Sequence, residues 1–119
     1  MERRHIRMDV WRDAVNFVHC VYELSREFPA DERFGLTSQV RRAVVSVPSN
    51  IAEGAARGSD REFLRFLYIA RGSLAEVETQ LIIAGELGYI GTGCHWEAEI
   101  ERVFAKIAAL INRLRTSLG

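Results

Sequence analysis

The chain has 119 residues, of which 48% are hydrophobic and 27% are charged. This length suits one domain with a single core, and the composition is typical of a globular protein rather than of a disordered, collagen-like or membrane chain. Sixteen basic and sixteen acidic side chains give a formal net charge of zero. No global field therefore draws the protein to nucleic acid or anionic lipid, and any such binding needs a local patch.

Targeting signals and disulfides are not expected. Cys20 and Cys94 are too few and too far apart for a disulfide framework. The segment Met1–Met8 is basic and lacks the apolar stretch of a signal peptide. Charged residues interrupt every apolar run before the roughly 18 residues that a membrane helix needs. We therefore expect a cytoplasmic protein with no membrane role.

The first predicted helix begins near Asp9, a suitable N-cap, and reaches Phe28, where Pro29 ends it. One set of residues recurs at helical spacing: Trp11, Ala14, Val15, Val18, Tyr22 and Ser25. A second set widens the apolar arc to about half of the circumference, more than one core face needs: Val10, Phe17, Leu24 and Phe28.

The second predicted helix spans about Thr37 to Ala56. Its core stripe has spacings of four, three and four residues: Val40, Val44, Val47 and Ile51. Pro48 lies inside this helix, where it removes the hydrogen bond to the Val44 carbonyl and costs roughly 3 kcal/mol unless the helix bends. We favour one kinked helix over two short ones because the apolar register continues across the proline.

The third helix is predicted to begin at Ser59, which forms a capping box with Glu62. Its stripe alternates spacings of four and three residues: Phe63, Leu67, Ala70, Leu74, Val77, Leu81, Ala84 and Gly88. Gly88 to Gly93 supplies a turn, and a fourth helix repeats the pattern: Trp96, Ile100, Val103, Ile107, Leu110, Leu114 and Leu118. The sequence therefore predicts a single all-α domain over residues 1–119, an antiparallel up-down four-helix bundle with a Pro-kinked second helix.

The third helix is also apolar outside its stripe, on faces that carry Leu64, Tyr68, Ile69, Ala75, Ile82, Ile83 and Leu87. A helix that is apolar nearly all round is buried on all sides. Three neighbours of similar length cannot enclose it, so we expect a second copy of the chain to cover the remaining surface.

Two polar lines border the apolar stripes, Gln39, Arg42, Ser46, Asn50, Glu53 and Arg57 on the second helix and Ser73, Glu76 and Gln80 on the third. They predict either a binding groove, with Glu53 and Glu76 as a possible acid and base, or a structural hydrogen-bond network that fixes helix register. The structural interpretation is favoured. No nucleophile with an attendant histidine appears, so we expect no enzyme and no cofactor.

A metal site is disfavoured, since the adjacent pairs His19-Cys20 and Cys94-His95 diverge by about 100° on a helix. Basic side chains form four groups of candidate phosphate contacts. They are Arg3, Arg4 and Arg7 at the N-terminus, the pair Arg41 and Arg42, the series Arg57, Arg61 and Arg65, and Arg102, Lys106 and Arg113 on the fourth helix. Each group has acidic neighbours, so ordinary solvated faces remain the alternative.

Two long motifs carry a family resemblance. One runs from Phe34 through Ser38-Gln39-Val40-Arg41-Arg42-Ala43 to Ser46-Val47-Pro48-Ser49-Asn50-Ile51-Ala52-Glu53-Gly54, and the other from Phe63-Leu64-Arg65-Phe66-Leu67 to Gly72-Ser73-Leu74-Ala75-Glu76-Val77-Glu78-Thr79-Gln80-Leu81. In these motifs the chain resembles the four-helix-bundle proteins encoded in intervening sequences of bacterial 23S rRNA genes.

The resemblance implies a kinked second helix and a ring-shaped homo-oligomer, which is a pentamer in this family. The polar-line residues belong to the family pattern without an assigned chemistry. More distantly, the fold is similar to accessory proteins of diversity-generating retroelements, which bind nucleic acid through a basic surface; the balanced charge departs from them. We therefore expect a non-enzymatic homo-oligomeric scaffold with RNA or a ribonucleoprotein as candidate partner. The alternative is a protein-protein interaction module without a nucleic-acid role, and an enzyme using Glu53 or Glu76 ranks third.

Overall fold

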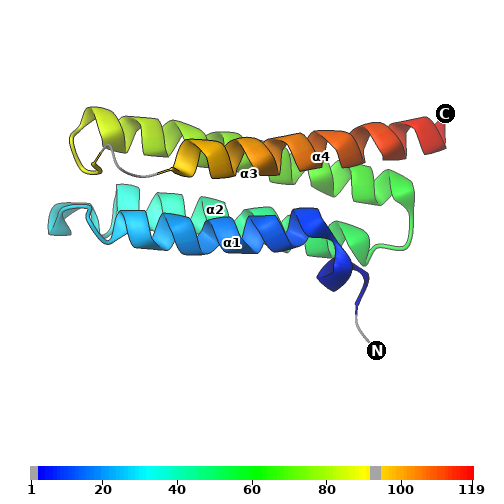
Figure 1. Ribbon diagram of the computed structural model, residues 1–119. Helices are drawn as coiled ribbons and strands as arrows, with labels where there is room; N and C mark the ends of the chain where they lie inside the picture. Colours follow the sequence, from blue (N-terminus) through cyan, green and yellow to red (C-terminus); the bar gives the residue numbers. More distant parts are fainter. Residues whose placement is uncertain (1–2, 92–94) are drawn as a thin grey trace.

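Four long helices make up the computed structural model, which describes residues 3–91 and 95–119. They are α1 (Asp9–Ser25), α2 (Leu36–Ala55), α3 (Asp60–Glu86) and α4 (Trp96–Leu118), with short 3-10 helices η1 (Arg4–Arg7) and η2 (Ala30–Glu32). Figure 1 shows the four helices side by side along one long axis, with both chain ends at the same end of the bundle. The prediction of an all-α protein with four helices is confirmed, and the packing between the helices fits a bundle.

The predicted stripes of α2, α3 and α4 meet in one core. Every stripe residue of α2 is at most 1% exposed, and so is every stripe residue of α3 from Phe63 to Ala84. The α4 stripe is buried from Trp96 to Leu114, whereas Leu118 is 45% exposed. On α1 the buried face consists of Val10, Ala14, Phe17, Val21 and Leu24. The predicted stripe of α1 is therefore wrong in part: Ala14 and Ser25 are buried, but Trp11, Val15 and Val18 are half-buried and Tyr22 is exposed. The set expected only to widen the apolar arc is the one that enters the core, because the face toward the other helices is rotated from the predicted stripe.

Both ends of α1 differ from the prediction. Met8, in an extended conformation, is the N-cap, and Asp9 is the first helical residue. The carboxylate of Asp9 therefore sits in the first turn, where the helix dipole favours negative charge. The helix ends at Ser25 rather than Phe28, because Glu27 and Phe28 donate to carbonyls three residues back, Leu24 and Ser25, at 3.1 and 3.2 Å. This tighter bonding is typical of a frayed last turn.

Pro48 lies within one continuous α2, so the alternative of two short helices is wrong. The proline is buried on the side of the helix that carries Val44 and Val47. Near Pro48, serine side chains of α2 donate hydrogen bonds to backbone carbonyls of the same helix. Ser49 Oγ donates to the Val45 carbonyl at 2.8 Å. The Val45 carbonyl is next to that of Val44, which loses its N–H partner to the proline, and a serine bond of this kind often accompanies a bend in a helix.

Defined caps fix both ends of α3. Ser59 is the N-cap as predicted, and its hydroxyl accepts from the Glu62 N–H at 3.1 Å. The Glu62 carboxylate accepts from Arg65 instead of completing the capping box. At the other end, Gly88 has a φ of 77°, and Tyr89 N–H donates to the Ala84 carbonyl at 2.9 Å. This Schellman arrangement needs a residue without Cβ at Gly88.

Glu32 ties the loop between α1 and α2 to the end of α3. One carboxylate oxygen accepts from the backbone N–H of Leu36 at 3.0 Å and thereby caps α2. The other accepts from the Tyr89 hydroxyl at 2.8 Å. A Cβ at Gly35 would lie 2.7 Å from this carboxylate, so glycine makes the capping contact possible.

The helices α2 and α3 approach closely at Gly54. A Cβ at this buried glycine would lie 2.7 Å from Phe66 Cβ and 3.0 Å from Phe63 Cδ1. Both atoms belong to side chains that are themselves buried against the bundle, so neither can withdraw. The absence of a side chain at Gly54 thus sets the distance between the two helices.

Substitution of Gly54 should show this constraint directly. Helix propensity alone favours alanine by about 1 kcal/mol. The steric overlap with Phe66 outweighs that gain, and we expect Gly54→Ala to lower the free energy of unfolding by about 1–2 kcal/mol. Gly72→Ala, on α3 with nothing within 4 Å of a new Cβ, is the matched control and should be stabilising. Urea denaturation measures both, and an equally stabilising Gly54→Ala would contradict the close approach.

The hydrogen bonds of Glu32 predict that the stability of the fold decreases in acid. The hydrogen bond from Leu36, followed by the one from Tyr89, lowers the pKa of Glu32 below its ordinary value of 4.5. A lowered native pKa means that the carboxylate stabilises the fold above pH 4.5 and that this contribution disappears as the pH falls through the native pKa. Glu32→Gln should therefore lower the melting temperature at neutral pH and narrow its difference from wild type in acid. Glu101→Gln, on exposed α4 surface, is the control, and a pH-independent difference for Glu32→Gln would refute the linkage.

Candidate functional site

The two predicted polar lines meet in a groove between α2 and α3. Gln39, Arg42 and Ser46 of α2 and Glu76 of α3 line a hollow of about 480 Å³ together with Phe34, Ser38 and Ala43. The structure therefore brings together four of the nine residues of the two polar lines. Asn50 and Ser73 are half-buried farther along their helices, Glu53 is exposed, and Gln80 is buried.

Gln80 is the buried end of the α3 line, at 6% exposure. Its amide nitrogen donates to a Glu76 carboxylate oxygen at 3.3 Å. Its amide oxygen has no hydrogen-bond partner among the described residues. A buried unpaired carbonyl destabilises a fold by about 1–3 kcal/mol, so Gln80 is a position where a donor from outside the described chain would be stabilising.

Ser46 and Asn50 hydrogen-bond within α2. Ser46 Oγ donates to the Ala43 carbonyl at 2.6 Å. Asn50 Nδ2 donates to the Ser46 carbonyl at 2.8 Å. These bonds direct both donors to their own helix in the turns on either side of Pro48. They support the structural interpretation of this part of the polar line.

The two carboxylates that were candidates for acid-base chemistry lie in different surroundings. Glu53 is paired with Arg57 at 2.7 Å, one turn along α2. Glu76 lies on the groove and accepts from Gln80. Only Glu76 faces the hollow, and no histidine or cysteine is among the residues that line it.

Arg41, one of the candidate phosphate contacts, has a defined place between α1 and α2. Its Nε donates to Ser25 Oγ at 2.7 Å, and its guanidinium carbon lies 4.6 Å from the Tyr22 ring centroid. Ser25 is 2% exposed and also donates to the Tyr22 carbonyl at 3.1 Å. The sequence did not single out Ser25 as a polar contact, because it occupies a core-face position of α1. Arg41 therefore joins two helices.

Two other candidate cations flank one aromatic ring. Arg57 and Arg65 lie 4.9 and 4.6 Å from the Phe66 ring centroid. Each also pairs with a carboxylate of its own helix, Glu53 and Glu62 respectively. These are ordinary exposed pairs of neighbouring turns, which contribute little to stability, and they leave this surface nearly neutral.

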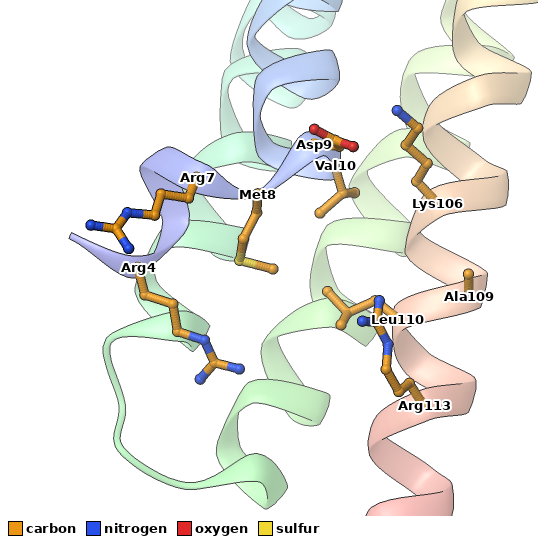
Figure 2. Close-up of a pocket in the computed structure, with 9 residues that line it drawn as sticks. All are labelled: Arg4, Arg7, Met8, Asp9, Val10, Lys106, Ala109, Leu110 and Arg113. Carbon is orange, nitrogen blue, oxygen red and sulfur yellow. The ribbon is translucent and has the colours of Figure 1, made fainter. Parts of the chain in front are cut away.

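The remaining candidates are distributed over α3 and α4. Arg61 and Arg102 are exposed. Lys106 Nζ pairs with Asp13 Oδ2 at 2.6 Å and so joins α4 to α1. Lys106 and Arg113 line a hollow of about 480 Å³ that also receives Arg4 and Arg7 of η1 (Figure 2). Arginines from two groups that are remote in sequence therefore meet here.

No group of three histidine, cysteine or acidic side chains among residues 3–91 and 95–119 is placed to hold a metal ion. Cys20 is half-buried against the core, and His19 and His95 are exposed. Cys94 lies outside the described residues. Within the same ranges, no helix is apolar over a length that would cross a bilayer.

Comparison with known proteins identifies the family. The sequence model of one protein family, the 23S rRNA-intervening sequence protein, matches residues 7–113. This range includes all of α1, α2 and α3 and most of α4. No curated protein matches the chain. The two motifs that carried the resemblance lie on α2 and its preceding loop and on α3, the pair that forms the polar groove. The chain belongs to the 23S rRNA-intervening sequence protein family.

Proposed function

We propose that this protein is a non-enzymatic scaffold that acts by self-association, with RNA or a ribonucleoprotein as its partner. The observation that carries the proposal is the apolar surface of α3. Tyr68, Ile69, Ile82 and Ile83 are between 37% and 48% exposed, and Leu87, directly after the helix, is 55% exposed. In a chain with a complete core, such a concentration of exposed apolar side chains marks an interaction surface.

A second copy of the chain is the occupant that this surface fits best. Ile69, Glu76 and Ile83 follow one another at seven-residue intervals along α3, so the groove carboxylate lies between two exposed isoleucines. Phe34, at 88% exposure, lines the same groove at the start of α2. An apolar rim around a polar centre, with the unpaired Gln80 oxygen nearby, is complementary to a surface that offers apolar side chains and a donor.

The proposal includes the arrangement and the number of copies in the assembly. A head-to-tail contact between unlike faces closes into a ring when the rotation permits. The chain has two unlike faces of this kind. One is the groove between α2 and α3, and the other is the side of α3 that carries Tyr68 and Ile82. The family resemblance favours five copies.

We also infer an antiparallel up-and-down order of the helices and a bend of α2 at Pro48. Contacts between helix ends support the order. Ser117, at the end of α4, lies 3.4 Å from Asp60, at the start of α3. Arg41, in the second turn of α2, bonds Ser25 at the end of α1. The Ser49 bond to the Val45 carbonyl supports the bend.

RNA binding is supported by the basic side chains Arg4, Lys106 and Arg113, which line one hollow beside η1. The protein-protein interaction module without a nucleic-acid role is the second candidate. It is favoured by the zero net charge and by the pairing of Arg57, Arg65 and Lys106 with acidic side chains. Absence of catalysis is proposed because Glu53 is paired with Arg57 and because no histidine or cysteine is among the residues that line the hollow with Glu76. A cytoplasmic location follows as part of the same proposal.

The self-association surface predicts the effect of charge on α3. Ile69→Asp combined with Ile83→Asp should reduce the solution mass to one chain, because two buried carboxylates cannot be desolvated at an apolar contact. Ala105→Asp combined with Ala108→Asp, at exposed positions of α4, adds the same charge elsewhere and should leave the mass unchanged. Light scattering at several concentrations makes the comparison. Equal masses for the wild type and the α3 variant would exclude this surface.

RNA binding predicts a strong salt dependence. A labelled single-stranded RNA should bind the purified protein at low salt and dissociate as salt rises, because each neutralised phosphate releases counterions. Fluorescence anisotropy at increasing salt measures the slope. Binding that is absent, or that does not change with salt, would remove RNA from the proposal and leave the protein-interaction module.

A further inference from the structure

The hollow between η1 and α4 combines charge with apolar lining. Arg4 and Arg7 come from η1, and Lys106 and Arg113 come from α4. Asp9 is the one acidic side chain among the nine that line it. In a chain whose total charge is zero, this is a local concentration of positive charge, and its volume of about 480 Å³ lies in the range of ligand sites.

Existing contacts leave two guanidinium groups best placed to bind a ligand. Lys106 is held by Asp13 at 2.6 Å. Arg4 lies over the Phe63 ring, with its guanidinium carbon 5.1 Å from the centroid. Stacking of this kind positions a guanidinium and leaves its N–H groups in the plane for other acceptors. Arg113 is exposed on α4, across the hollow from Arg4.

The lining between these two arginines is apolar. Met8, Val10 and Leu110 contribute the apolar side chains, and Val10 and Leu110 belong to the buried core. In Figure 2, Leu110 lies beside the Arg113 guanidinium on the side of Arg4, and Met8 lies above Arg4. A ligand that fits carries a negative group for the arginines and a less polar body for the surface between them.

We propose that this hollow binds a nucleotide phosphate, with Arg4 and Arg113 as the principal contacts. The guanidinium fork matches the oxygens of a phosphate and binds two of them at once. The sugar and base that carry the phosphate then lie on Met8 and Leu110. The phosphate belongs either to an RNA strand or to a free nucleotide. The inference deepens the RNA-binding part of the proposed function and rests on it.

The site lies apart from the proposed self-association surface. The hollow is formed by η1, α1 and α4, whereas the polar groove and its apolar rim belong to α2 and α3. A ring that buries the second surface repeats the hollow once in every copy. Repetition raises the affinity for a strand that reaches more than one copy, without any new contact.

The test compares two variants that each lose two positive charges. Arg4→Gln with Arg113→Gln removes the proposed contacts. Arg26→Gln with Arg115→Gln is the control, because both of these arginines are exposed and neither lines the hollow. Light scattering and thermal melting should show the wild-type assembly and fold for both variants.

Titration with a labelled single-stranded RNA should separate them. We expect the hollow variant to bind the RNA at least about tenfold more weakly than the wild type at low salt. Its slope of log affinity against log salt should fall by about 0.7, the value for one phosphate contact on a single strand. The control variant should keep most of the wild-type affinity. Equal losses in both variants would overturn the site and leave RNA binding in place, whereas an RNA that fails to bind even the wild type would overturn both.

Competition for the labelled RNA identifies which molecule supplies the phosphate and whether the hollow prefers a nucleotide to another anion. Displacement of the RNA by adenosine monophosphate, lost in the hollow variant, would show that a free nucleotide suffices. Failure of the monophosphate to compete, together with the loss in the hollow variant, would assign the site to the phosphates of a strand. Displacement by polyglutamate as effective as that by unlabelled RNA would overturn the choice of a nucleotide over an acidic peptide.

Discussion

The close approach of α2 to α3 at Gly54 is the constraint on which the other features depend. With no Cβ at this position, Phe63 and Phe66 pack directly against the α2 backbone. This contact places the polar line of α2 beside that of α3, so that Arg42 and Ser46 face Glu76 across one groove. It also turns Ile69 and Ile83 outward, since the opposite side of α3 is committed to the core. The groove and the exposed apolar rim are therefore two consequences of one contact.

The sequence predicted the parts of the fold that follow from periodic burial. The stripes of α2 and α3 became core, and Ser59 became the N-cap of α3, because spacing and capping chemistry are local properties. The ends of α1 were less well predicted. The N-cap is Met8 and not Asp9, one residue earlier than predicted. The last turn tightens before Pro29, and the pattern of side chains does not encode this change.

Contacts between residues distant in the chain were not predictable from pattern. Glu32 and Tyr89 are 57 positions apart, and Ser25 and Arg41 are 16 apart. Each pair depends on how the helix ends meet. The candidate site was predicted in part for the same reason. The composition of the polar lines was visible in the sequence, but only the packing shows that Glu76 faces the groove, that Gln80 is buried and that Ser46 and Asn50 bond their own helix.

Two surfaces with different chemistry give the protein its proposed role. The apolar face of α3 suits a second copy of the chain, and the basic hollow beside η1 suits a phosphate. Zero net charge then keeps nonspecific attraction to nucleic acid low, so that binding depends on the local hollow and on its repetition in an assembly.

The most direct test of this view is the mass of the wild-type protein in solution, measured by light scattering. A mass several times that of one 13.5 kDa chain, about five times for the expected ring, is the predicted result. A mass of 13.5 kDa at all concentrations would contradict it.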